Sequence, residues 1–241
     1  MSETLLFGVV ASSPLVLGAV VGTRLELPRR LLAGLLSFAA GALIAALAFE
    51  LFQDAFQQGG PWRAGIGMLV GAVVFTALSA LLDRWASSDG DEQSASSTSA
   101  AAGLALLAAV TLDGVPENLA LGVSLSEGSG GIALLAAIFV SNFPEAVVGS
   151  ASMRHQGRST GFVVGTWTAA AILLTFAVVV GAGALSATAP ETVSLPLAFA
   201  AGAVLASLAD TLMPEAYEDG GPLVALTTTA GFVLAFLLAT V

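Results

Sequence analysis

The chain has 241 residues, of which 56% are hydrophobic and only 10% are charged. A soluble domain carries about 25% charged residues, so this composition excludes a water-facing globular surface and requires lipid to cover much of the protein. The net charge of −10 argues against nucleic acid as a partner, and the absence of Cys excludes disulfides and thiolate metal sites.

Eight apolar stretches, each about 20 residues long, can cross a bilayer as helices. They cover residues 4–23, 31–52, 64–82, 100–123, 130–153, 161–185, 194–215 and 222–241. We therefore predict an all-α integral membrane protein of about eight transmembrane helices.

The predicted helices divide a single transmembrane domain, residues 1–241, into three groups. Residues 1–85 hold the first three helices. The stretch 86–99 is rich in Ser and acid, which is typical of a flexible loop. Residues 100–153 hold a central pair whose short connection predicts an antiparallel hairpin, and residues 159–241 hold the last three helices.

The arginines indicate an orientation, because all seven basic residues are Arg and six fall in three loops on one side. Those six are Arg24, Arg29, Arg30, Arg84, Arg154 and Arg158. The positive-inside rule makes their side cytoplasmic, which places the 86–99 loop inside and both termini outside. The start Met1-Ser2-Glu3 lacks a basic region, so no cleavable signal is expected. Trp62, Trp85 and Trp167 are expected to be lipid or interface anchors.

Two internal repeats accompany this pattern. Residues 38–56 (FAAGALIAALAFELFQDAF) and 199–217 (FAAGAVLASLADTLMPEAY) lie in the second and seventh helices, which cross in opposite directions. Residues 103–118 and 131–146 repeat within the central hairpin and share Pro-Glu at matching positions. Inverted repeats are typical of transporters, so we predict a 3+2+3 arrangement. The alternative is the low-complexity similarity that is common among Ala-rich membrane helices.

Three carboxylates lie within the central helix pair. Asp113 and Glu117 are four residues apart and share one helical face, and Glu145 takes the matching place in the next helix. An Asp at the bilayer centre costs about 2.5–3.5 kcal/mol on insertion scales, and a like charge one turn away adds to that cost. Because a divalent cation would reverse this repulsion, we predict a metal site here.

A proline precedes each of the two glutamates. Pro116 and Pro144 each remove a backbone hydrogen bond and crowd the carbonyl four residues back, and a freed carbonyl is a hard oxygen ligand. Ser141 and Asn142 add further oxygens on the second helix. The alternative is that the prolines are simple kinks and that the acids are protonated and hydrogen-bonded.

Other polar residues are open to two interpretations. Glu50, Asp54, Asp210 and Glu215 lie towards the ends of the second and seventh helices. These four acids are explained about equally well as residues that line an ion pathway or exit and as ordinary solvated helix ends. His155, which is the single histidine, is expected at the surface in a short loop flanked by Arg.

These motifs resemble the ZIP family of divalent metal-ion transporters, in its compact microbial form, over nearly the whole chain. The fourth span of that family typically reads His-Asn-x-Pro-Glu-Gly, and residues 113–118 read Asp-Gly-Val-Pro-Glu-Asn. The fifth span typically carries a polar pair before x-Pro-Glu, and residues 141–145 read Ser-Asn-Phe-Pro-Glu. Residues 210–216 (DTLMPEA) resemble the family's pattern near the cytoplasmic exit.

The resemblance implies transport of Zn²⁺, Mn²⁺ or Fe²⁺ through the cell membrane into the cytoplasm, by alternating access. The metal would be a transported substrate, with no cofactor. Carried onto this sequence, the ligands are Asp113, Glu117, Ser141 and Glu145, and Asn142 serves a second metal position. A homodimer is a further implication, although Gly- and Ala-rich helices pack as well within one subunit as between two.

The sequence departs from the family pattern where the histidine would be, because Asp113 stands there. A site of oxygen ligands suits harder ions than a histidine site does, so we hypothesise a shift from Zn²⁺ towards Mn²⁺ or Fe²⁺. The main alternative function is a carrier of another substrate, coupled to protons or Na⁺ through the same carboxylates. An enzyme is not expected, since a serine protease or a zinc enzyme would need a histidine within the spans.

Overall fold

The computed structural model describes residues 2–88, 111–112, 114–126, 131–185 and 190–239. Within these residues the regular structure is entirely helical, as predicted. Five helical stretches are long and apolar enough to cross a membrane, and a shorter apolar helix, Leu223–Ala239, follows them. The five stretches are Glu3–Gly22, Arg29–Leu82, Ile132–His155, Thr160–Gly183 and Glu191–Gly220. The described residues therefore form an all-α structure whose long apolar helices are suited to a membrane.

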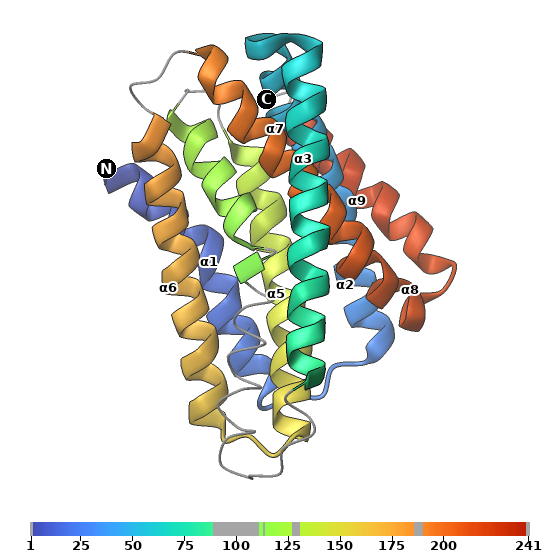
Figure 1. Cartoon of the computed structure of the whole chain (residues 1–241). Coiled ribbons are helices and arrows are strands. Elements are labelled where there is room, and N and C mark those ends of the chain that lie inside the picture. The colour runs from blue at the N-terminus through green and yellow to red at the C-terminus, as the bar shows by residue number, and fades with distance from the viewer. Residues whose placement is uncertain (1, 89–110, 113, 127–130, 186–189, 240–241) are drawn as a thin grey trace.

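The helices form an elongated bundle (Figure 1). The labelled helices are α1 (Ser2–Gly22), α2 (Arg29–Ala46), α3 (Gln53–Ser88), α5 (Ile132–His155), α6 (Thr160–Leu185), α7 (Pro190–Ser207), α8 (Met213–Gly220) and α9 (Leu223–Ala239). Two π-helical turns, η1 (Leu47–Phe52) and η3 (Leu208–Leu212), join α2 to α3 and α7 to α8. Residues 114–126 form one more helix, which precedes α5 in the chain.

The helix that contains the predicted third span, residues 64–82, is longer than that span, and the loop predicted at 86–99 begins too early. Helix α3 begins at Gln53 and bends at Gly60, whose φ of 73° and ψ of 177° are outside the helical region and are accessible to glycine at little cost. The helix then continues through Ser88, so residues 86–88 are helical although they were assigned to the loop. Ser is tolerated at a helix end. The rest of that loop, 89–99, lies outside the described residues.

Trp167 was wrongly predicted to be a lipid anchor. It is 2% exposed and packs within a cluster of α1, α5 and α6 residues. The reason is Gly149 on α5, where a Cβ atom would stand 2.5 Å from the indole ring. A glycine on one helix thus makes room for the largest side chain of another. Trp62, by contrast, is 82% exposed, and the side chain of Trp85 is not among those described.

The helices pack as two groups. In the first, α1 packs along both α5 and α6, and the 114–126 helix lies against α6. In the second, α3 packs on α7 and α2 packs on α9. The groups meet mainly where α2 lies along α5. Figure 1 shows α1 and α6 on one side of the bundle and α9 on the other, with α5 between them. We call these the α5 group and the α2 group.

Reciprocal glycine contacts bring the helices of the α2 group together. A Cβ at Gly41 would meet the backbone carbonyl of Thr228, and one at Gly231 would meet that of Phe38, so α2 and α9 touch backbone to backbone. Gly71 and Gly202 make the same exchange between α3 and α7. In lipid no hydrophobic force drives helices together, so this close backbone approach provides the van der Waals contact that holds them.

Candidate functional site

The 114–126 helix turns two different faces to its neighbours. Gly122 lies against the carbonyl of Val178 on α6, so one face packs on that helix. Leu121 and Ser124 lie on another face, against Gly131 at the start of α5. Glu117 is 7% exposed and stands one turn before Leu121, which places it on the α5-facing side at helical spacing. The carboxylate is thus buried at the contact between the two central helices.

On α5, the polar residues of the predicted site are anchored by hydrogen bonds. Ser141 and Asn142 are 0% and 3% exposed. The hydroxyl of Ser141 donates to the carbonyl of Ile138 at 3.1 Å. The Nδ2 of Asn142 donates to the carbonyl of Ala11 on α1 at 2.8 Å, which ties α5 to α1 and leaves Oδ1 as the atom able to accept or to bind a cation.

Pro144 and Glu145 lie one turn further along α5. Pro144 is inside the helix and buried, and Glu145 is partly buried. Asp113 lies outside the described residues. Among those that are described, no group of three or more His, Asp or Glu side chains is close enough to hold a metal ion. The described part of the predicted site is therefore two glutamates, Ser141 and Asn142, on two helices in contact.

Glu50 has a specific partner that the sequence did not indicate. It is 8% exposed, and its Oε1 and Oε2 accept hydrogen bonds from the backbone N–H groups of Ala133 at 3.1 Å and Leu134 at 2.8 Å. These are free N–H groups in the first turn of α5, where the helix dipole favours a negative charge. Glu50 therefore caps α5 from a different helix group, rather than lying at a solvated helix end.

The other three acids of the second and seventh spans differ from Glu50 in their surroundings. Asp210 is exposed and accepts a hydrogen bond from the hydroxyl of Ser79 on α3 at 2.8 Å. Asp54 is partly buried near the start of α3. Glu215 lies on α8, at the wall of a cavity. Of these three acids, Glu215 is the one that lines this cavity.

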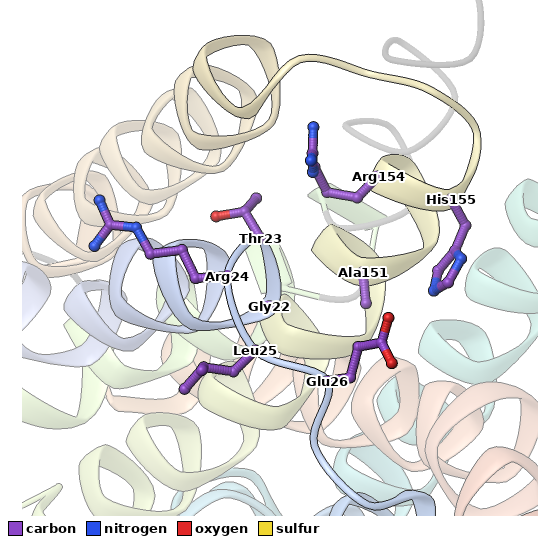
Figure 2. Close-up of a pocket in the computed structure, with 8 residues that line it drawn as sticks. All are labelled: Gly22, Thr23, Arg24, Leu25, Glu26, Ala151, Arg154 and His155. Carbon is purple, nitrogen blue, oxygen red and sulfur yellow. The ribbon is translucent and has the colours of Figure 1, made fainter.

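That cavity, of about 580 Å³, separates α2 and α8 from α5 at the Arg-rich end of the bundle. Its polar lining residues are Glu26, Arg29, Ser152, His155, Glu215 and Asp219. A smaller pocket of about 250 Å³ adjoins it and shares Glu26 and His155. In Figure 2 the Glu26 carboxylate and the His155 ring lie on the same side of that pocket, and Arg24 points away from them.

His155 and Glu26 were missed as candidates in the sequence. His155 was predicted to lie in a loop, but it belongs to the last turn of α5. Its side chain is exposed, as expected. A signal was present in the spacing, since His155 and Ser152 share a face of α5 with Val148, three to seven residues apart. The sequence could not show that α2 and α8 leave this face of α5 open to a cavity.

No protein-family model matches the chain, and no curated protein matches it either.

Proposed function

We propose that this protein transports divalent metal cations, Zn²⁺, Mn²⁺ or Fe²⁺, across the cell membrane into the cytoplasm by alternating access. The ion is held by carboxylates of the two central helices, with Asp113, Glu117 and Glu145 as charged ligands and Ser141 and Asn142 as neutral ones. It loses part of its water shell at the site, and the protein itself forms no covalent bond. The protein is a member of the ZIP family in this proposal.

The observation that carries the proposal is a buried carboxylate within a predicted span, between two helices in contact. Glu117 is 7% exposed on the side of its helix that meets α5, and α5 supplies Ser141 and Asn142 from buried positions. An ionised group in the bilayer is costly unless it is paired. A cation shared with Glu145 and Asp113 compensates that cost and gives these residues a common purpose.

We also propose eight crossings in a 3+2+3 arrangement with inverted outer repeats and both termini outside. Helical stretch Arg29–Leu82 is about 80 Å long at 1.5 Å per residue and bends at Gly60, so it crosses a 30 Å bilayer twice. The repeats support the inversion, because Phe38 and Gly41 contact α9 just as Phe199 and Gly202 contact α3. Each repeat also enters a π-helical turn at the equivalent residue, Leu47 or Leu208.

Import is the direction that the family resemblance implies, and the cavity offers a route for it. The cavity of about 580 Å³ opens at the Arg-rich end and reaches Val147 on α5, less than one turn from Glu145. A cation that leaves the site towards this end meets Glu215, Asp219 and Glu26 on the way. The positive-inside rule assigns this end to the cytoplasm, so the cavity provides the exit that import would use.

The test is metal uptake into proteoliposomes, measured separately with Mn²⁺, Fe²⁺ and Zn²⁺. We expect Glu117→Gln and Glu145→Gln each to lower uptake by more than tenfold, since even indirect supports of a metal site cost about 10- to 100-fold in affinity. The matched control is Glu191→Gln. Glu191 pairs with Arg63 at 3.3 Å on the surface, with 73% of its side chain exposed, so its loss should leave uptake unchanged.

The ions distinguish the hypotheses that remain. Uptake of Mn²⁺ or Fe²⁺ ahead of Zn²⁺ is expected from a site that lacks imidazole and thiolate ligands, and dominant Zn²⁺ uptake would contradict that preference. If the wild-type protein carries none of the three metals, the carboxylates serve protons or Na⁺ instead, and the coupled carrier of another substrate becomes the function.

A further inference from the structure

Glu50 joins the two helix groups at the end of the bundle opposite the Arg-rich end. It lies on η1, which continues α2, and its carboxylate binds the first turn of α5 through the N–H groups of Ala133 and Leu134. Both hydrogen bonds run from backbone N–H groups to the carboxyl oxygens, and the site is shielded from water because Glu50 is 8% exposed. This contact connects a side chain of the α2 group with the backbone of the α5 group.

The same interface is open at its other end. The cavity at the Arg-rich end has Leu32 and Leu36 of α2 on one wall and Val148 and Ala151 of α5 on the other. Leu134 and Val148 are about 20 Å apart along α5. The two helices are thus joined at one end and separated at the other, and Ser141 lies between the two levels.

The acid on the other π-helical turn, Asp210, stands one residue out of register with Glu50 in the repeat and makes no such connection. Asp210 lies on η3 as Glu50 lies on η1, yet its partner is Ser79 on α3, within the same helix group. The reason is local: α3 lies along α7 at this level, whereas α5 begins beside η1. Of these two acids on π-helical turns, Glu50 is the one that crosses between the groups.

We propose that Glu50 is a latch, which holds the bundle closed at the end opposite the Arg-rich end while the Arg-rich end is open. Its release from the first turn of α5 lets the two groups part at that end. The identity of the ion that then enters rests on the proposed function. The closure itself does not depend on which substrate is carried.

Two single-cysteine reporters test the latch, because the chain has no native cysteine. Ala137 is 1% exposed and stands one turn inside the latch on α5, and Val148 lines the open cavity. Each is replaced by Cys, and its reaction with a charged thiol reagent is timed in lipid nanodiscs, where both ends of the protein meet solvent. In the parent, we expect slow labelling of Ala137→Cys and fast labelling of Val148→Cys.

Glu50→Gln keeps the shape of the side chain and removes its charge. We expect it to raise the labelling rate of Ala137→Cys about tenfold and to lower that of Val148→Cys, since one end opens as the other closes. Glu50→Asp, which keeps the charge but shortens the reach, should give an intermediate change. The control Gln53→Ala removes an exposed side chain three residues further along the chain, and both rates should stay within twofold of the parent.

Unchanged rates in Glu50→Gln would overturn the latch. A rise at both reporters would also overturn it, because a general loosening means that Glu50 only supports the fold. Metal uptake is measured in parallel to separate the two proposals. If the reporters respond but the protein takes up no metal, the latch stands and the proposed metal transport fails. If the protein takes up metal but the reporters do not respond, metal transport stands and the latch fails.

Discussion

At the scale of single residues, buried hydroxyl groups of this protein fall into two kinds. Ser194 is 0% exposed, and its hydroxyl donates to the carbonyl of Ala55 at 2.7 Å, which links α7 to α3. Ser150 is equally buried on α5, but its hydroxyl has no hydrogen-bond partner among the described residues. A buried polar group that lacks a partner costs free energy, whereas one that is paired contributes a modest net gain.

Replacement of these two serines by alanine should therefore have opposite effects. We expect Ser194→Ala to lower the free energy of unfolding by about 0.6–1.7 kcal/mol, from the average to the maximum measured for hydrogen bonds between membrane helices. Ser150→Ala should be neutral or stabilising, because it removes a group whose burial is uncompensated. Reversible unfolding in mixed micelles measures both, and an equal loss in the two variants would contradict the distinction.

At the scale of helices, contact between backbones sets which pairs pack closely. Gly71 lies against the carbonyl of Phe199, and Gly202 lies against the carbonyl of Met68, so α3 and α7 interlock at two points. An ion pair between Arg63 and Glu191 at 3.3 Å lies at one end of this pair of helices, but it is solvent-exposed and exposed ion pairs contribute about 0–1 kcal/mol. The glycines, rather than this ion pair, therefore set how closely α3 and α7 approach.

A methyl group added at one of these glycines should separate the helices. At Gly202, the Cβ of an alanine would overlap the carbonyl of Met68, so we expect Gly202→Ala to destabilise the protein by about 1–3 kcal/mol. Gly65 on α3 is the matched control, because a Cβ there meets no atom within 4 Å. Gly65→Ala should be neutral or stabilise by up to about 1 kcal/mol through helix propensity. Similar melting shifts for the two variants would refute this account.

At the scale of the whole molecule, the two ends of the bundle differ. At one end, Glu50 of η1 binds the first turn of α5. Phe49 at that end makes an edge-to-face ring contact with Phe236 on α9, at a centroid distance of 5.1 Å. The other end holds the cavity lined by Glu215 and His155. This asymmetry is what an alternating-access carrier has in one of its two end states.

The orientation of the two ends can be read with the same cysteine-free background. Gln57 precedes the bend at Gly60 and Gln156 follows α5, and both are exposed. In intact cells, an impermeant thiol reagent should label Gln57→Cys at least about tenfold faster than Gln156→Cys, because the Arg-rich end faces the cytoplasm. Permeabilised cells should label both. The reverse order in intact cells would show that the cavity opens outside and that the proposed orientation is wrong.

Much of the helical pattern could be predicted from residues alone. The start of the first span was predicted at residue 4 and that of the sixth at 161, and the helices begin at Ser2 and Thr160. Runs of apolar residues are unambiguous here because a bilayer demands a nearly fixed length. The bend at Gly60 and the π-helical turns at Leu47 and Leu208 were not predicted, since the neighbouring residues are compatible with a continuous helix.

The sequence by itself determined that this is a helical membrane protein with paired Pro-Glu helices, because too few charges are present for any other surface and the acids are few enough to stand out. Only the tertiary structure decided that Glu50 caps α5, that Trp167 is buried and that a cavity lies beside His155. The physical reason is that lipid tails and a protein interior are equally apolar. Hydrophobicity therefore places a residue within the membrane, and only packing shows whether it meets lipid, another helix or a cavity.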